Sequence, residues 1–244
     1  LLMLATTVAV VAVAPFVTIV SVPAAGTDLF VVVALLTLGA AALALAGLDT
    51  GTAFGGMGAS REITILALVE PTLLVAIFAL SVPVGSTDLA DIVTSILHDP
   101  SRAITPANLL AGVALGLAVV AETGRLPVDN PSTHLELTMV HEAMVLEYAG
   151  PDLALVELAS AMRLSVFLGL WATLFAPSGI AADASAGGLA LGALVFTVKV
   201  TALGAALAAG EVFLAKLRLF RVPELLAGSF VLALLAVVAS FSFG

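Results

Sequence analysis

The chain has 244 residues, of which 61% are apolar and 10% charged, with a formal net charge of −9. A soluble domain is nearer half apolar and a quarter charged, so this composition excludes that class and predicts an all-α, polytopic membrane protein. The acidic balance argues against nucleic acid as a partner. The chain contains no cysteine and therefore cannot hold an iron–sulfur cluster or a nickel–iron centre through thiolates.

Seven apolar windows follow one another along the chain, each long enough, or nearly so, to cross a hydrocarbon core of about 30 Å. We expect these spans at 1–22, 29–47, 63–82, 107–121, 153–175, 188–210 and 224–243. Together they predict one integral membrane domain over residues 1–244. The first window starts within an apolar run and lacks the charged start of a signal peptide, so we interpret it as a span and expect the true N-terminus to be missing.

Basic residues set the expected orientation. The connections at 48–62, 122–152 and 211–223 carry five of them, Arg61, Arg125, Lys216, Arg218 and Arg221, whereas those at 23–28, 83–106 and 176–187 carry Arg102 alone. The positive-inside rule therefore places the first group, including the acidic stretch, on the cytoplasmic side.

Residues 47–62 (GLDTGTAFGGMGASRE) are rich in glycine but lack the Lys-Ser/Thr of a phosphate loop. We interpret them as a flexible, close-packed turn into the third span. Arg61 either anchors the mouth of that span or pairs with an acid. Inside the span, Glu70 precedes Pro71, which can kink the helix. A carboxylate at that depth is costly if charged, so we favour a buried proton-exchange site over a packing hydrogen bond.

The acidic stretch from Glu122 to Glu157 lies between two apolar runs and has one cation, Arg125. Its other acids and histidines are Asp129, His134, Glu136, His141, Glu142, Glu147 and Asp152. Asn130 and Pro131 predict a helix start, and Gly150-Pro151 predicts its end near Tyr148, with Asp152 capping the fifth span.

On the predicted helix, His134, Thr138 and His141 share one face, since they are four and three residues apart. The two histidines are either hydrogen-bonded core residues or part of a functional site. The His141-Glu142 pair does not continue as a zinc-protease motif, because Val145 stands where the second histidine is required. We therefore expect no metal site.

Two cations lie near the middle of predicted spans, Arg163 and Lys199, and each requires a partner there. Structural ion pairs are one interpretation. The favoured one is a connected line of titratable groups whose charges influence one another. Its members are Glu70, Glu122, Glu136, Glu142, Glu147, Glu157, Arg163 and Lys199.

The segment ETGRLPVDNPSTHLELTMVHEAMVLEYAG resembles the large cytoplasmic loop of subunit one of respiratory complex I and of related membrane-bound nickel–iron hydrogenases. The version DNPSTHLELTMVHEAMVLEY resembles hydrogenase-4 component C and similar energy-converting subunits, and GMGASRE with Glu70-Pro71 fits the same group. The quinone-reducing branch reads Glu-Thr-Asn-Arg and then Pro-Phe-Asp, whereas this chain has Glu122-Thr-Gly-Arg125 and then Pro127-Val-Asp129. The resemblance covers essentially the whole chain, and the family has eight spans, so the missing one would be the first.

The resemblance implies a membrane anchor subunit that couples electron transfer to proton or sodium translocation through buried glutamates. It implies peripheral hydrogenase-like large and small subunits and antiporter-like membrane subunits as partners, in the cell membrane. The nickel–iron centre and iron–sulfur clusters would be held by those partners, with a quinone as a further possibility. Docking residues near the junction with the peripheral arm would be Arg61, Arg125, Asp129, His134 and His141, in the 122–152 loop and beside it.

Three alternatives remain open. One is a subunit of an NADH–quinone oxidoreductase that forms part of a quinone site. Another is a stand-alone cation transporter that relies on Glu70, Arg163 and Lys199. A purely structural anchor without an ion path is a third reading.

Overall fold

The computed structural model describes residues 1–20, 27–129, 139–217 and 221–243, and in these residues the regular structure is helical apart from two isolated bridges. The helices are α1 (Leu2–Val13), α2 (Leu29–Asp49), α3 (Ala53–Ser81), α4 (Leu89–His98), α5 (Pro106–Glu122), α6 (His141–Val145), α7 (Gly150–Phe175), α8 (Ala186–Phe213) and α9 (Val222–Phe243), with a 3₁₀ helix, η1, at Pro100–Ile104.

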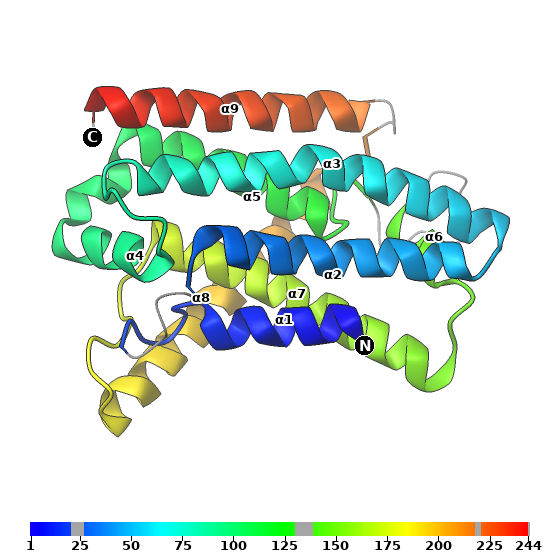
Figure 1. Cartoon of the computed structure of the whole chain (residues 1–244), viewed down its shortest axis with the longest axis horizontal. Coiled ribbons are helices and arrows are strands. Elements are labelled where there is room, and N and C mark those ends of the chain that lie inside the picture. The colour runs from blue at the N-terminus through cyan, green and yellow to red at the C-terminus, as the bar shows by residue number, and fades with distance from the viewer. Residues whose placement is uncertain (21–26, 130–138, 218–220, 244) are drawn as a thin grey trace.

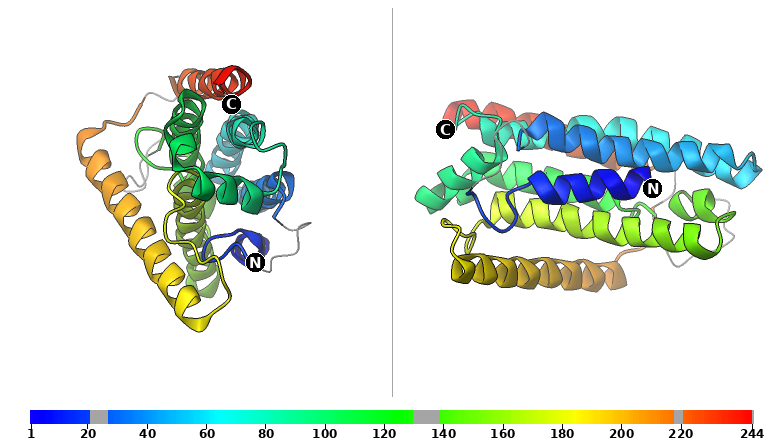
Figure 2. Two further views of the ribbon diagram at one scale, coloured as in Figure 1. Left: turned by 90° about the vertical axis from the view of Figure 1, so that its left-hand side faces the viewer. Right: turned by 60° about the horizontal axis from the view of Figure 1, so that its bottom comes forward.

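The long helices lie side by side along the longest axis of the molecule (Figure 1). Helix α3 is central, since it packs against α2, α5, α6 and α9, while α1 packs against α2 and α7. Helix α8 lies at one edge, mainly against α7 (Figure 2), and Gly192 is its one buried residue. The α6 and α4 regions lie at opposite ends of the bundle (Figure 1).

Five helices in the described part of the chain, α2, α3, α7, α8 and α9, are long and apolar enough to cross a membrane. They confirm five of the predicted windows. The fourth window is the shorter α5, which reaches Glu122 as expected. The first window is helical only to Val13, so a continuous helix over 1–22 is wrong. Pro15 lacks an amide donor, and the chain beyond it pairs with Ala181 through Ile19 N–H and Val17 C=O (3.3 and 2.9 Å).

The glycine-rich segment was predicted as a turn, but α3 already begins at Ala53 and continues through Pro71. Thr52 caps it by accepting from Gly55 N–H at 3.2 Å. The glycines serve close packing: a Cβ on Gly58 would lie 2.8 Å from Val140 O, and one on Gly55 would lie 2.4 Å from Gly47 O. Small residues thus let α2, α3 and α6 approach one another, which propensity alone does not reveal.

The connection over 83–106 contains an amphipathic helix that we did not predict. In α4, Leu89, Ile92, Val93 and Ile96 form the buried face. The spacing follows a helical period, and Asp88 in front of it is a typical cap, so the signal was present in the sequence.

The helix predicted from Pro131 to Tyr148 falls partly on residues 130–138, which lie outside the described residues, as do His134 and Glu136. In the described remainder only His141–Val145 is helical, so the continuous helix to Tyr148 is wrong there. Asp152 does not cap α7 either. That helix starts at Gly150, whose positive φ of 58° turns the chain, and Pro151 stands in its first turn.

Candidate functional site

A buried ion pair joins α5 to α7 in the middle of the bundle. Arg163 donates from its guanidinium to Glu122 Oε1, and the two side chains are 4% and 2% exposed. Arg163 thus has an acid from another helix as its partner, which the sequence required but did not identify. One polar atom of each residue, Glu122 Oε2 and Arg163 Nη1, is buried without a hydrogen bond to any described residue. The pair is therefore incompletely satisfied.

Helix α2 provides the space that the guanidinium occupies. A Cβ built on Gly39 would lie 2.8 Å from Arg163 Nη1 and 2.7 Å from Thr6 Oγ1. Real Cβ atoms do not approach so closely, so only glycine leaves this slot open. Arg163 also lies over the ring of Phe167, with 5.3 Å from its Cζ to the ring centroid. The orientation of Arg163 towards Glu122 is therefore fixed by packing on two sides.

Glu62 is a site residue that the sequence analysis missed. It lies in α3, is 7% exposed, and interacts electrostatically with Glu122, Arg163 and Asp129. Glu70, eight residues further along α3, is half-buried and interacts electrostatically with Glu122. The sequence signal that could have identified Glu62 is its position beside Arg61, at the start of an apolar run. The sequence analysis assigned Glu62 to the loop over residues 48–62. The structure thus brings three carboxylates and one guanidinium together.

Asp129 connects three segments at the α6 end of the bundle. Its Oδ2 accepts from the backbone N–H groups of Val140 and His141 at 3.1 and 3.2 Å, and its Oδ1 accepts from Lys216 Nζ at 2.9 Å. Leu217 N–H additionally donates to Pro127 O at 2.8 Å. A carboxylate with these charge-assisted bonds holds its neighbours in place, so Asp129 orders the start of α6.

Two cations flank this arrangement. Arg61 donates to Met139 O at 2.7 Å, so it ties α3 to the segment before α6, and among the described residues it forms no ion pair with an acid. Arg125 lies 3.9 Å from Glu211 at the end of α8. The positive groups therefore fasten the connections to the helix ends.

His141 links this end of the bundle to α7, because its Nε2 lies 3.3 Å from Ser160 Oγ. Burial lowers its pKa below the ordinary 6.5, and nearby Arg163 and Arg125 act in the same direction while Asp129 opposes them. The neutral ring is therefore the stable form in the folded protein.

A cavity of about 450 Å³ opens beside His141, between the turn after α5, α6 and the first half of α7. Glu142, which is half-buried, and Glu157, which is exposed, both line it. Polar groups at its wall include Arg125, Asp129 and Ser160. The cavity thus lies beside Asp129 and His141, and neither Glu122 nor Arg163 lines it.

Two residues of the predicted line of titratable groups lie away from the buried pair and the cavity. Glu147 is exposed and does not line the cavity. Lys199 donates to the carbonyl oxygens of Ala176 and Ser178, where α7 ends, so its partners are backbone groups rather than acids. Within the described residues, no group of three His, Asp or Glu side chains is placed to hold a metal ion.

Long apolar helices packed around buried charges define a polytopic, all-helical membrane protein. The model of the NADH dehydrogenase family matches residues 1–241, and the chain belongs to that family, which is the family of complex I subunit 1. The resemblance found in the acidic stretch is therefore confirmed at family level.

Two relatives from Escherichia coli (strain K12) are similar to this chain. Hydrogenase-4 component C is 36% identical over 177 residues, which cover 72% of this chain and 55% of that protein. Formate hydrogenlyase subunit 4 is 32% identical over 212 residues, which cover 87% of this chain and 68% of that protein. The chain therefore spans about half of the first relative and two thirds of the second.

A solved structure shares the fold. It is a chain from the membrane-bound sulfane sulfur reductase (MBS), described as an archaeal respiratory membrane complex, with a TM-score of 0.78. The match covers 98% of this chain and 77% of that one at 20% sequence identity. The likeness shows that the arrangement of helices is common to both proteins.

Proposed function

We propose that this chain is the membrane anchor subunit of a complex I-like complex of the hydrogenase type, and that its buried carboxylates couple electron transfer to proton or sodium translocation. The names of the two relatives support the hydrogenase branch. Hydrogenase-like large and small subunits would dock at the α6 end, and antiporter-like subunits would pack laterally. The nickel–iron centre and iron–sulfur clusters belong to those partners, because this chain has no thiolate.

The proposal includes a membrane topology for the chain. Helices α1 and α5 cross the membrane with the five longer ones, giving seven spans in this chain. The 122–152 connection faces the cytoplasm, as the basic residues Arg61, Arg125 and Lys216 near the α6 end require.

The single observation that carries the coupling role is the incompletely satisfied pair of Glu122 and Arg163. A charge inside a membrane bundle is expensive, and here each partner keeps a buried polar atom without a described hydrogen-bond partner. Glu62 and Glu70 lie within electrostatic range of Glu122, so a proton gained by one carboxyl changes the affinity of the next. A series of carboxyl groups coupled in this way can pass charge inward from a docked redox unit.

The test uses the assembled complex in vesicles and compares ions moved with electrons transferred. We expect E62Q to lower this ratio at least twofold while the complex still assembles. Glu62 makes no hydrogen bond or ion pair to any described residue, so its amide replacement breaks none. E122Q should also lower the ratio. Because it removes the counter-charge of the buried Arg163, it should lower stability as well, so assembly of this variant is checked first.

The matched control is E224Q, because Glu224 is an exposed acid in the first turn of α9. If E62Q and E122Q both retain full ion movement at unchanged redox rate, the coupling role is wrong and the chain is a structural anchor. If the purified chain moves ions without any partner, the stand-alone transporter is the correct function.

A second function is favoured by the cavity beside His141, which is open to solvent and lined by both polar and apolar groups. A quinone head group there would meet the donors His141, Ser160 and Arg125, with Leu146 and Leu164 against its apolar part. The quinone would itself be the acceptor of two electrons. Protection of the cavity from labelling by an added quinone analogue, lost in S160A, would support this alternative.

A further inference from the structure

A second cavity, of about 250 Å³, lies at the opposite end of the bundle, among α4, η1, the start of α5 and the end of α9. It is remote from the site proposed for coupling, and the inference below does not depend on that function. Because α2 and α5 begin here and α3 and α9 end here, this level of the molecule is where lipid meets water in a spanning bundle.

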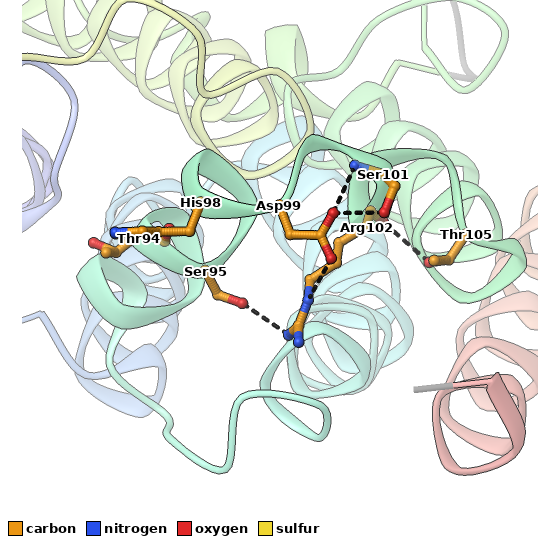
Figure 3. Close-up of polar contacts among 7 residues, drawn as sticks. All are labelled: Thr94, Ser95, His98, Asp99, Ser101, Arg102 and Thr105. Atoms are coloured by element: carbon orange, nitrogen blue, oxygen red, sulfur yellow. Dashed lines mark hydrogen bonds and ion pairs between the residues drawn. The ribbon is translucent and has the colours of Figure 1, made fainter.

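The cavity has an apolar floor and a polar mouth. Leu80, Ile92 and Ile96 form part of the floor, and Ser95 and Arg102 lie at the mouth. Figure 3 shows Arg102, Ser95 and Asp99 pointing towards one another, whereas His98 points away with Thr94. A cavity of this kind fits a small polar group attached to an apolar body.

The guanidinium of Arg102 is oriented but not saturated. Its Nη1 donates to Ser95 Oγ at 2.9 Å, and its Nε lies 3.6 Å from Asp99 Oδ2. A guanidinium has five N–H donors, and the other donors of Arg102 have no described partner. The side chain is 42% exposed, so a ligand can reach it. A planar donor of this type binds phosphate well.

Asn108 adds a second unpartnered group. It lines the cavity, is 7% exposed, and its side-chain amide forms no hydrogen bond with any described residue. The amide atoms of Asn108 are not among the fully buried, unpartnered atoms of the described residues, so they face the cavity, where they can bond water or a polar ligand.

Asp99 supplies a negative charge at the same mouth. Its Oδ1 accepts from the N–H and O–H of Ser101 at 3.2 and 2.5 Å, which holds the pKa of the Asp99 carboxyl below its ordinary value, with a further contribution from Arg102. The carboxylate therefore stays charged beside the guanidinium. A ligand matched to both groups carries an anion and a cation a few atoms apart.

Exposed apolar side chains continue from the mouth along the membrane-facing side. Ile104, Leu109 and Val113 are 73%, 58% and 55% exposed, and the last two are one turn apart on the same face of α5. They form a track on which acyl chains can lie while the head group enters the cavity.

We propose that this cavity binds the head group of a phospholipid with a primary amine, with its phosphate on Arg102 and Asn108 and its ammonium on Asp99. Free phosphate would bind Arg102 and Asn108 but bring no cation to Asp99. A choline head group would present no N–H donor to Asp99, and a glycerol head group would leave Arg102 as the one cation described beside Asp99. The site therefore favours phosphatidylethanolamine among common membrane lipids.

The experiment delipidates the purified protein or its complex and reconstitutes it in nanodiscs of phosphatidylethanolamine and phosphatidylcholine in equal parts. Native mass spectrometry then counts retained lipids. We expect one retained phosphatidylethanolamine, with at least tenfold lower retention in R102Q and a severalfold loss in N108L. N108L removes a buried amide, so a folding failure is not expected from it.

The matched control is R221Q, which alters an exposed arginine at the opposite end of the bundle and should leave retention unchanged. Added inorganic phosphate or phosphoethanolamine should compete weakly, because neither uses the apolar track. Equal retention of the two lipids, unchanged retention in R102Q with N108L, or full displacement by inorganic phosphate would each overturn the proposal. So would a neighbouring subunit that protects Arg102 from modification in the lipid-free complex.

Discussion

At the scale of single residues, burying Arg163 between helices carries a large desolvation cost. The desolvation penalty of Arg163 is offset by Glu122, while Gly39 and Phe167 hold the guanidinium in position. Removing one partner of such a pair leaves an uncompensated charge. The geometry of the slot is therefore as important to the site as the charged groups themselves.

Substituting Gly39 tests the slot directly. We expect G39A to destabilise the protein by about 1–3 kcal/mol, because the new Cβ overlaps Arg163 Nη1 and Thr6 Oγ1. G56A is the matched control: Gly56 is also within a helix, nothing lies within 4 Å of its added Cβ, and we expect stabilisation by about 0.5–1 kcal/mol. Thermal unfolding in detergent measures both. Equal changes in stability in G39A and G56A would contradict the inference that Gly39 makes room for the guanidinium of Arg163.

The buried ring of His141 predicts a dependence of stability on pH. Its folded pKa lies below the ordinary 6.5 of an unfolded histidine, so the unfolded chain binds more protons as pH falls below 6.5. Stability is therefore fully present above about pH 6.5 and is lost as pH decreases towards the folded pKa.

Melting temperatures between about pH 5 and pH 8 would measure this loss. We expect H141Q, whose amide can still reach Ser160, to flatten the profile. H98Q changes an exposed histidine and should leave the profile as in the parent protein. A profile that is unchanged in H141Q would show that other groups cause the pH dependence.

At the scale of elements, helices α2 and α4 begin at the same place and cap one another. Asp28 accepts from Phe30 N–H and from Thr87 Oγ1, while Asp88 accepts from Ala90 N–H and from Thr27 Oγ1. Leu29 N–H and Leu89 N–H also donate to the carbonyls of Thr87 and Thr27 (2.9 and 3.1 Å). This symmetric junction fixes α4 across the end of the bundle.

Removing one of the two caps should weaken both helix starts. We expect D88A to cost about 1–2 kcal/mol, because it loses an N-cap bond and the bond from Thr27. D91A lies in the first turn of the same helix and contacts Ser86 at the surface, so its cost should stay under about 1 kcal/mol. Equal losses in chemical unfolding experiments would rule out the reciprocal cap.

Element boundaries also show where sequence patterns mislead. The glycine-rich residues 47–62 were predicted to form a flexible, close-packed turn, because glycine allows close backbone approach. In the structure Gly55 and Gly58 are helical and buried against α2 and α6, since close packing replaces the lost propensity. In the acidic stretch, the sequence pattern predicted more helix than the described residues form. Its cap-like and stop-like residues predicted a long helix, but Asp129 directs its carboxylate to the backbone of Val140 and His141 instead.

At the scale of the whole molecule, the cavity beside His141 and the cavity beside Arg102 lie at opposite ends of one bundle. The basic connections gather at the α6 end, whereas α4 and η1 lie at the other (Figure 1). The two ends therefore face different compartments in the proposed orientation.

Single cysteines can test this orientation, since the chain contains none of its own. We expect a membrane-impermeant maleimide added to intact cells to label H98C at the α4 end. A149C, which is exposed beside α6, should react only after the membrane is opened. Labelling of both from outside, or the reverse pattern, would contradict the assignment of the acidic connection to the cytoplasm.

The sequence by itself determined the class of the protein, five of its spans, the family and the need of Arg163 for a partner. These features depend on composition, on apolar length and on motifs that are contiguous along the chain. Only the tertiary structure decided that the partner is Glu122, that Glu62 joins it, that Lys199 binds backbone carbonyls, and that Gly39 makes the slot. The physical reason is that a buried charge is satisfied by whichever group packing brings within hydrogen-bond distance, and these contacts join helices far apart in the chain.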